Sequence, residues 1–245
     1  MTTPLANLLV ITAHPGDFVW RAGGAIASAV DAGNAVSITC LSYGERGESA
    51  SLWRQGKSLE EIKAVRREEG TRAAAALGAE VEFLDVGDYP IVETPALVEA
   101  LVATYRRVQP SIVLTHANDD PYNDDHAVAS RIARKARVLA QAPGVQPGQG
   151  EIIGAPPVFF FEPHQPEVCN FRPDVLLDIT HVWDRKRTAM ETLSAQGHLR
   201  EYYTDLGKRR GVQAKRNSGP NLGLAVDCYA EAYQRVYPQV TSELA

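Results

Sequence analysis

An unbroken apolar run near the amino terminus, Leu8 to Ile11, restricts the possible folds of this chain more than any other feature. Such a run is typical of a parallel strand that is buried on both faces, so we expect a strand over 7–12. The strand ends in a turn that carries His14 and Asp17. In an open α/β sheet, groups at the carboxyl end of a strand point into the crevice where ligands bind. The run therefore predicts a mostly parallel sheet with these two side chains at its ligand-binding edge.

Strand and helix patterns alternate along the rest of the chain. Further strands are expected over 35–42, 80–85, 111–115, 158–161 and 175–179. Helices are expected over 17–32, 59–77, 95–108 and 126–139, the second of them opened by a Ser58–Glu61 capping box. This alternation predicts an α/β fold, a Rossmann-like three-layer sandwich with helices on both faces of the sheet. Helical patterns from 182 onward and over 224–237 add a helical C-terminal extension, 182–245, to a single domain spanning 1–245.

Composition excludes several classes of function. The chain has 245 residues and 44% hydrophobic residues, which fits one large domain of ordinary globular composition. It has no apolar run near the ~20 residues of a membrane helix, and residues 1–4 show no secretion signal. The three scattered cysteines fit reduced thiols, and the net charge of −5 argues against nucleic-acid binding. We therefore expect a cytoplasmic protein with a small-molecule partner and neither nucleic-acid nor membrane binding.

Histidines gather at one edge of the predicted sheet. Four of them fall at or just beyond strand ends: His14, His116, His126 and His164. Ionisable groups that converge in a cleft indicate a metal or catalytic site. His126 can complete a His-Asp-His set with His14 and Asp17, and three protein ligands leave room for water or substrate, as a catalytic zinc site requires. The alternative for His14 and Asp17 is a core histidine followed by a helix N-cap.

Two carboxylates precede His126 in the sequence. Asp125 or Asp124 can orient a ligand histidine from behind. The alternative is that they only complement the positive end of the following helix, which fits Asp124 better than Asp125.

Three motifs carry a resemblance to a known family: Ala-His-Pro-Gly-Asp at 13–17, Gly23-Gly24, and Asn-Asp-Asp-His at 123–126. In these motifs the chain resembles the zinc-dependent deacetylase superfamily of PIG-L and LmbE-like proteins. The resemblance implies an LmbE-like, Rossmann-like fold and zinc held by His14, Asp17 and His126. The paired glycines lie inside a predicted helix, where close approach of a neighbouring element explains them.

The same motifs depart from the family pattern at positions that perform hydrolysis. The family's A-H-P-D-D-E has its general base where this chain has Gly16, and its glutamate where this chain has Phe18. Asn123 replaces the first histidine of H-P-D-H, which steadies the tetrahedral intermediate. A positioned general base contributes roughly 10²–10⁴-fold, so its loss predicts a poor amidase that keeps its metal ligands.

Within the superfamily the chain is most similar to the hydratase branch of bacterial gallate catabolism. The matching stretches are 44–49, 160–164 and 209–214. This resemblance implies a hydro-lyase that adds water to the C=C bond of 4-oxalomesaconate, an unsaturated oxo-tricarboxylate, to give 4-carboxy-4-hydroxy-2-oxoadipate. It also implies Zn²⁺ as the cofactor and, because family members are commonly multimeric, a homo-oligomer.

Conjugate hydration needs an electrophile, a group that takes a proton from water and a group that protonates carbon. Glu48 and His164 follow two different predicted strands, and the resemblance supports both as this acid–base pair. We expect Glu48 to act as the base, with the reverse assignment left open. The alternatives are a solvated loop carboxylate for Glu48 and a structural histidine for His164.

A polycarboxylate substrate also needs polar and cationic contacts. We predict Arg46, Asn123 and Arg216 as substrate-binding residues, although Arg216 can instead contact a neighbouring subunit. The basic run 208–216 is otherwise typical of a solvated face. Arg66 and Glu69 are one helical turn apart and are expected to form a structural ion pair.

Two other functions stay open at this point. An N-deacetylase of the PIG-L type would need Asp119 or Glu48 to replace the missing base. A non-catalytic protein would keep the metal site as a small-molecule sensor.

Overall fold

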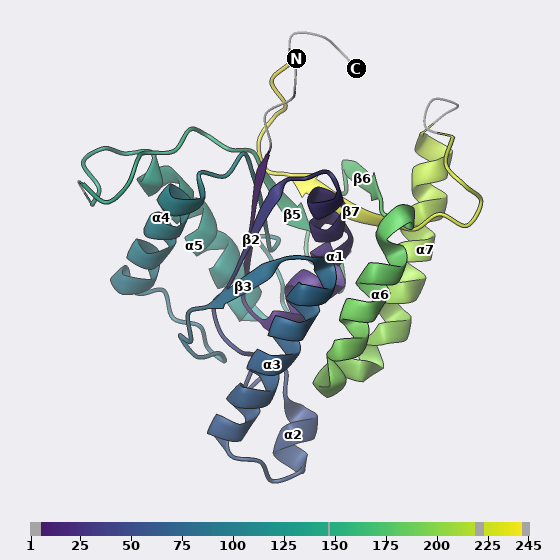
Figure 1. Cartoon of the computed structure of the whole chain (residues 1–245), viewed down its shortest axis with the longest axis horizontal. Coiled ribbons are helices and arrows are strands. Elements are labelled where there is room, and N and C mark those ends of the chain that lie inside the picture. Colours follow the sequence, from purple (N-terminus) through teal and green to yellow (C-terminus); the bar gives the residue numbers. More distant parts are fainter. Residues whose placement is uncertain (1–5, 147, 219–222, 242–245) are drawn as a thin grey trace.

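The computed structural model describes residues 6–146, 148–218 and 223–241, and at its centre is one seven-stranded sheet (Figure 1). The strands are β1 (Asn7–Thr12), β2 (Ala35–Cys40), β3 (Glu80–Phe83), β4 (Ile112–Thr115), β5 (Val158–Phe161), β6 (Val175–Asp178) and β7 (Ala230–Arg235). The α-helices are α1 (Pro15–Asp31), α2 (Ala50–Arg54), α3 (Leu59–Leu77), α4 (Pro95–Val108), α5 (Asp124–Ala140), α6 (Trp183–Thr192) and α7 (Arg200–Asn217). Two 3-10 helices, η1 (Thr180–Val182) and η2 (Ser194–Leu199), precede α6 and α7.

The sheet is mostly parallel, with the strand order β3-β2-β1-β4-β5-β7-β6. Every neighbouring pair from β3 to β5 is parallel, whereas β7 runs antiparallel to both β5 and β6. One hydrophobic cluster packs α1, α3 and α6 on one face, and a second packs α4 and α5 on the other (Figure 1). The predicted Rossmann-like three-layer α/β sandwich is therefore confirmed.

The connections reverse direction between β1 and β4. From β1 the chain proceeds across the sheet to β2 and β3, then returns to β4 on the opposite side of β1 and continues to β5. The two central strands are adjacent, with Leu9 opposite Val113. In open α/β sheets this reversal opens a crevice at the carboxyl ends of the two strands, where ligands bind. The segments after β1 and β4 therefore meet at one crevice.

Several element boundaries follow from local chemistry. The Ser58 hydroxyl accepts a hydrogen bond from the Glu61 N–H, and the Glu61 carboxylate accepts one from the Ser58 N–H, so α3 begins as predicted. It ends as predicted at Leu77, before Gly78 in the left-handed conformation. Helix α1 begins at Pro15, with His14 at the N-cap position, so the N-cap alternative for Asp17 is wrong. The short helix α2 lies in the segment 43–57, between β2 and α3.

The helix predicted over 224–237 is wrong, because Ala230–Arg235 forms β7. This strand lies between β5 and β6, and the adjacent residues Ala232 and Tyr233 are both buried. A strand covered on both faces shows no alternation of polar and apolar residues, so its spacing also fits a helix. The carboxyl-terminal extension is therefore not wholly helical, and its separation from the rest of the domain stays a prediction.

Within the described ranges no helix is long and apolar enough to cross a membrane. Residues 1–4, on which the expectation of no secretion signal rests, lie outside the described residues, as do 242–245 of the extension.

Candidate metal centre and active site

Three histidines meet at the crevice between β1 and β4. His14 follows β1, His116 follows β4, and His126 lies in the first turn of α5. All three are buried, with at most 3% of their surface exposed. The carboxylate of Asp17, in the first turn of α1, lies 3.3 Å from Nδ1 of His14 and 3.3 Å from Nε2 of His126. It also lies 3.4 Å from Nε2 of His116, so Asp17 is the centre of the cluster.

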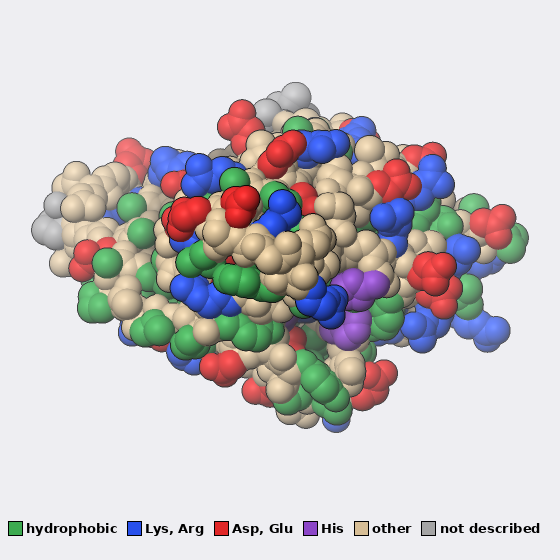
Figure 2. All heavy atoms as spheres, turned by 90° about the horizontal axis from the view of Figure 1, so that it is seen from below, with side chains coloured by type: hydrophobic (Ala, Val, Ile, Leu, Met, Phe, Trp, Pro, Cys, Tyr) green, Lys and Arg blue, Asp and Glu red, His purple; other side chains and the backbone are tan. Residues whose placement is uncertain are grey.

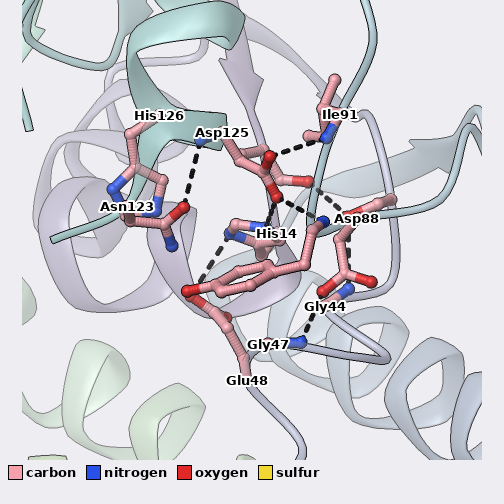
Figure 3. Close-up of polar contacts among 12 residues, drawn as sticks. His14, Gly44, Gly47, Glu48, Asp88, Ile91, Asn123, Asp125 and His126 are labelled. Atoms are coloured by element: carbon pink, nitrogen blue, oxygen red, sulfur yellow. Dashed lines mark hydrogen bonds and ion pairs between the residues drawn. The ribbon is translucent and has the colours of Figure 1, made fainter.

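The ring of His14 is held from behind by Asp125 (Figure 3). Its Nε2 lies 3.3 Å from Oδ2 of Asp125, whose carboxylate also accepts hydrogen bonds from the N–H groups of Tyr89 and Ile91. A carboxylate accepts, so Nε2 carries the hydrogen and Nδ1 faces the cluster. Nδ1 is buried and has no hydrogen-bond partner. The orienting contact expected of Asp125 is present, whereas Asp124 is exposed.

His126 is oriented in the same way by Asp120, a residue that the sequence analysis missed. Nδ1 of His126 lies 2.8 Å from Oδ2 of Asp120, so Nε2 faces Asp17 and has no hydrogen-bond partner. Carboxylates behind a histidine are typical of metal sites because they fix the ring and its tautomer. Two buried imidazole nitrogens, Nδ1 of His14 and Nε2 of His126, therefore face Asp17, and each offers a lone pair to an ion once it is deprotonated.

The donor atoms fit a metal ion. One ligand atom each from His14, Asp17, Glu48 and His126 lies within 4.8 Å of the others. Two ligands bound at about 2.0–2.1 Å to a tetrahedral ion stand about 3.3 Å apart. The contacts of 3.2 and 3.3 Å in the cluster are of that size, with His14 facing Oδ2 and His126 facing Oδ1 of Asp17. The three predicted ligands are therefore brought together, with Glu48 beside them.

Burial and charge both favour a cation here. Burial alone would raise the pKa of Asp17, but the imidazoles of His126 and His116 hold it well below its usual value. Burial alone would lower the pKa of His14, but the carboxylates around it, Glu48 first, raise it well above its usual value. A proton on His14 therefore supplies positive charge when no ion does, and metal binding would release that proton.

His116 lies at the site but has a different role. Its Nε2 accepts a hydrogen bond of 3.0 Å from the N–H of Ala13, so this nitrogen is not free to bind an ion. Its ring stacks on His126, with the centroids 4.2 Å apart. Burial, and then the neighbouring His126, lower the pKa of His116 to about 3, so the ring is neutral near pH 7. It forms a wall of the cluster.

Glu48 reaches the cluster from the loop that follows β2. Its Oε1 lies 3.2 Å from Nδ1 of His14 and its Oε2 lies 3.6 Å from Nη2 of Arg66. The loop passes so close to Tyr89 that a Cβ on Gly47 would lie 1.9 Å from that ring. Burial would raise the pKa of Glu48, but His14 and other neighbours lower it, so the carboxylate is ionised. With its side chain 12% exposed, Glu48 is not a solvated loop carboxylate.

His164 follows β5 at the same edge of the sheet, outside the group of ligand atoms. Its ring stacks on Tyr202 of α7 at 4.2 Å, and the Tyr202 hydroxyl donates to its backbone carbonyl. Glu162 and Arg210 form a two-bond ion pair beside it, which joins the end of β5 to α7. Burial, and then Arg21, lower the pKa of His164. Figure 2, which views the molecule from below, shows histidine side chains at the surface beside basic ones.

Two of the predicted substrate-binding residues border this site. Arg46 lies in the loop that carries Glu48, and its half-exposed guanidinium is 3.7 Å from Asp88. Asn123 is the N-cap residue of α5, and its side chain accepts a hydrogen bond of 3.2 Å from the N–H of Asp125 (Figure 3). Both side chains therefore combine a structural contact with a position near the cluster.

The third predicted substrate-binding residue is remote. Arg216 is exposed in the last turn of α7. At 1.5 Å per residue it lies about 21 Å along the helix from Tyr202. The structure does not bring Arg216 to the site of its own chain.

Two buried arginines lie near the cluster, and the sequence patterns did not identify either of them as a site residue. Arg66 forms the predicted ion pair with Glu69 at 2.7 Å, but it also faces Glu48. Arg21 lies one helical turn beyond Asp17, and its Nε is 3.7 Å from that carboxylate. The i, i+4 spacing was a visible signal for Arg21, whereas no spacing predicts the contact between Arg66 and the loop.

The fold and the site define a class of protein: a Rossmann-like α/β domain with a buried His-Asp-His cluster where the strand order reverses. The model of the PIG-L family, GlcNAc-PI de-N-acetylase, matches residues 9–137. The chain belongs to the PIG-L family, which confirms the resemblance seen in its motifs.

Similar proteins include both hydratases and deacetylases. A 4-oxalmesaconate hydratase of Pseudomonas putida is 53% identical over all of this chain and 95% of its own length. The crystal structure of GalB, the 4-carboxy-2-hydroxymuconate hydratase of Pseudomonas putida, has a TM-score of 0.93 at 52% identity, covering 98% of this chain and 100% of that one. A probable N-acetyl-alpha-D-glucosaminyl L-malate deacetylase 2 of Bacillus cereus is 24% identical over 75% of this chain and 80% of its own length.

Proposed function

We propose that this protein is a hydro-lyase that adds water to the C=C bond of 4-oxalomesaconate to give 4-carboxy-4-hydroxy-2-oxoadipate in gallate degradation. The 53% identity to a protein named 4-oxalmesaconate hydratase, over the whole chain, supports this. The structural observation that carries the proposal is a change of base. Gly16 has no side chain to act on water, whereas the ionised Glu48 carboxylate lies 3.2 Å from His14.

We propose Zn²⁺ as the ion held by His14, Asp17 and His126, whose donor atoms converge. When bound, zinc supplies a Lewis acid that draws electrons toward a carbonyl oxygen of the substrate. Two further proposals rest on the resemblance and the sequence: a homo-oligomer and a cytoplasmic location.

Glu48 and His164 are the proposed acid–base pair. Glu48 is ionised and so takes a proton from the attacking water, whose hydroxyl adds to one carbon of the double bond. His164 protonates the neighbouring carbon; because its pKa is lowered, its protonated form is a stronger acid but the minor form near pH 7. The reverse assignment, with His164 as the base and Glu48 as the acid, stays open, because each group can gain or lose a proton to solvent between turnovers.

The substrate carboxylates need cationic and polar partners, and Arg46 and Asn123 border the site on its loop and helix sides. We propose these two as contacts within the chain. Arg216 would contribute only at the site of a neighbouring copy, because of its distance along α7.

The test is turnover of 4-oxalomesaconate, followed by the loss of its conjugated-enone absorbance. Glu48→Ala and His164→Ala should each lower turnover at least about a hundredfold while zinc content stays unchanged. Glu68→Ala and His181→Ala, at exposed positions, are the matched controls and should retain full turnover. Full activity in either site variant removes that residue from the mechanism, and an inactive zinc-loaded wild type contradicts the proposed function.

N-deacetylation is the second candidate, favoured by the retained ligand cluster and by the family model. Asp119, one of the expected substitutes for the base, is exposed and accepts a hydrogen bond from Asn170, which leaves Glu48 as the carboxylate at the cluster. Free amine released from an N-acetyl sugar would support this candidate. Silence in both assays with zinc bound would leave the sensor function.

A further inference from the structure

One side chain of η2 contacts the proposed base at Oε2, whereas the contact with His14 is made by Oε1. The amide nitrogen of Gln196 donates to Oε2 of Glu48 at 3.2 Å, and its amide oxygen accepts from Nη2 of Arg66 at 3.0 Å. Gln196 is 6% exposed and Arg66 is fully buried. The amide therefore bridges a carboxylate and a guanidinium away from solvent.

The bridge is anchored on both sides. Arg66 also donates to the carbonyl of Tyr43 at 3.2 Å and pairs with Glu69 at 2.7 Å. Glu69 in turn accepts hydrogen bonds from the Ser194 hydroxyl and the N–H of Ala195, at the start of η2. Helix α3 therefore fixes the segment that carries Gln196.

The same amide occupies the space beside Gly16. A Cβ on Gly16 would lie 2.4 Å from Oε1 of Gln196 and 2.9 Å from Nε1 of Trp20. Separations below 3.0 Å essentially never occur, so any side chain at position 16 must displace the amide. The Gln196 bridge therefore occupies the space that a side chain at position 16 would need.

We propose that Gln196 is a positioning residue for Glu48, and that Gly16 is required because it leaves room for the Gln196 amide. The inference rests on the proposed function, in which Glu48 is the base. The Gln196 amide meets both partners, since it has a donor for the carboxylate and an acceptor for the guanidinium. A glutamate at position 196 would pair with Arg66 but repel Glu48, and a leucine would remove one hydrogen bond from each of them.

The first test is a double-mutant cycle between the two residues. Gln196→Leu should lower kcat about tenfold to a hundredfold, the effect of losing a hydrogen bond to a charged group, with KM for 4-oxalomesaconate within about twofold. In a Glu48→Gln background the same substitution should cost less than about twofold, because the group it positions is gone. Gln196→Glu should be no better than Gln196→Leu. Gln149→Leu, at an exposed loop position, is the control and should leave kcat unchanged.

The second test uses the glycine. Gly16→Ala should lower kcat by displacing the amide, and adding Gln196→Ala should cost much less than it does in the wild type, because the amide has already left its place. Additive losses in either cycle overturn the inference, as does full kcat in Gln196→Leu. If wild-type protein fails to hydrate the substrate, the proposed function has failed instead. A crystal structure of Gln196→Leu then still decides the positioning role, which is wrong if Glu48 keeps its place.

Discussion

Helix α1 touches two clusters of buried charge, one at its amino end and one near its middle. At the middle, Lys186 of α6 pairs with Glu231 of β7 at 2.7 Å. Glu231 also accepts hydrogen bonds from the N–H groups of Gly24 and Ala25, at 2.7 and 2.8 Å, and from the Tyr233 hydroxyl at 2.6 Å. Lys186 donates in addition to a backbone carbonyl of α1. This cluster fastens α6 and β7 to the helix.

The cluster at the amino end is as deeply buried but is bonded differently. Nδ1 of His14 and Nε2 of His126 have no hydrogen-bond partner, although both face the Asp17 carboxylate. Buried polar groups are almost always hydrogen-bonded, so exceptions need an explanation such as an ion. The comparison teaches that buried charge alone does not indicate function. Buried ring nitrogens that lack a hydrogen-bond partner and face one carboxylate do indicate a functional site.

The largest expected effect on metal binding and activity comes from the cluster at the amino end of α1, where His14 and His126 have ring nitrogens without a hydrogen-bond partner. Asp17→Asn keeps the shape of the side chain but removes the negative charge and the carboxylate ligand that lies between His14 and His126. Loss of a carboxylate behind a ligand costs about 10–100-fold in metal affinity or activity, so loss of the central ligand should cost more than about 100-fold in both. Added zinc should raise the unfolding temperature of the wild type and not that of the variant, measured by calorimetry.

Asp124→Asn is the matched control for that experiment, since Asp124 is exposed one residue from the orienting Asp125. It should bind zinc as the wild type does. Full zinc binding by Asp17→Asn would show that the free nitrogens have another purpose.

The fully bonded cluster should respond in stability alone. Lys186→Met leaves Glu231 buried without its cation, which costs about 3–5 kcal/mol in the free energy of unfolding. Zinc bound per folded chain should not change, because the cluster has no free ligand atom. Urea titration measures the first quantity and metal analysis the second. Adding Glu231→Gln removes the unpaired charge and should restore part of the loss; a single variant that loses less than about 1 kcal/mol contradicts this account.

Local patterns predicted much of this fold because the information is local. An apolar run, a capping box and a helix stop are enough to bound β1 and α3. The paired glycines also had the expected cause, since a Cβ on Gly24 would lie 2.5 Å from Cγ2 of Ile179. Strand β7 escaped prediction because burial on both faces hides the strand period.

The candidate site was predictable in part for a related reason. Segments that follow the ends of neighbouring parallel strands meet at one edge of the sheet, so the segments that carry His14 and His126 could be paired from topology. The bridge from Arg66 to Gln196 joins residues 130 positions apart, and no spacing rule reaches that far. Groups that support the site from behind therefore needed the structure.

A smaller effect should appear in the pH dependence of the metal-free protein. His116 has its pKa lowered to about 3 by burial and by His126, so between pH 6.5 and 3 the unfolded chain binds a proton that the folded chain does not. The free energy of unfolding therefore falls as the pH falls through this window, by about 1 kcal/mol from this group between pH 6.5 and 5.5. His116→Asn should flatten that slope in urea titrations with chelator present. His181→Asn, at an exposed position, should leave the slope as it is.

The smallest expected effect on stability concerns a half-exposed charge pair, which is less buried than either cluster. Arg46 keeps 46% of its side chain exposed, with Nη1 3.2 Å from Glu45 and 3.7 Å from Asp88. An exposed pair contributes about 0–1 kcal/mol, so Arg46→Met should hardly change the unfolding temperature. If the guanidinium also binds a substrate carboxylate, KM for 4-oxalomesaconate should rise about tenfold, with kcat within about twofold, because a charged hydrogen bond is lost.

Steady-state kinetics of Arg46→Met beside Arg72→Met separates the two contributions of Arg46. Arg72 is exposed and forms its own surface pair with Glu68, so its loss removes a comparable charge away from the site. An equal KM in both variants would assign Arg46 to the surface pair alone. A rise in KM confined to Arg46→Met would assign Arg46 to substrate binding beside the metal cluster. A guanidinium that bonds to its own chain through only some of its N–H groups keeps the others for a ligand.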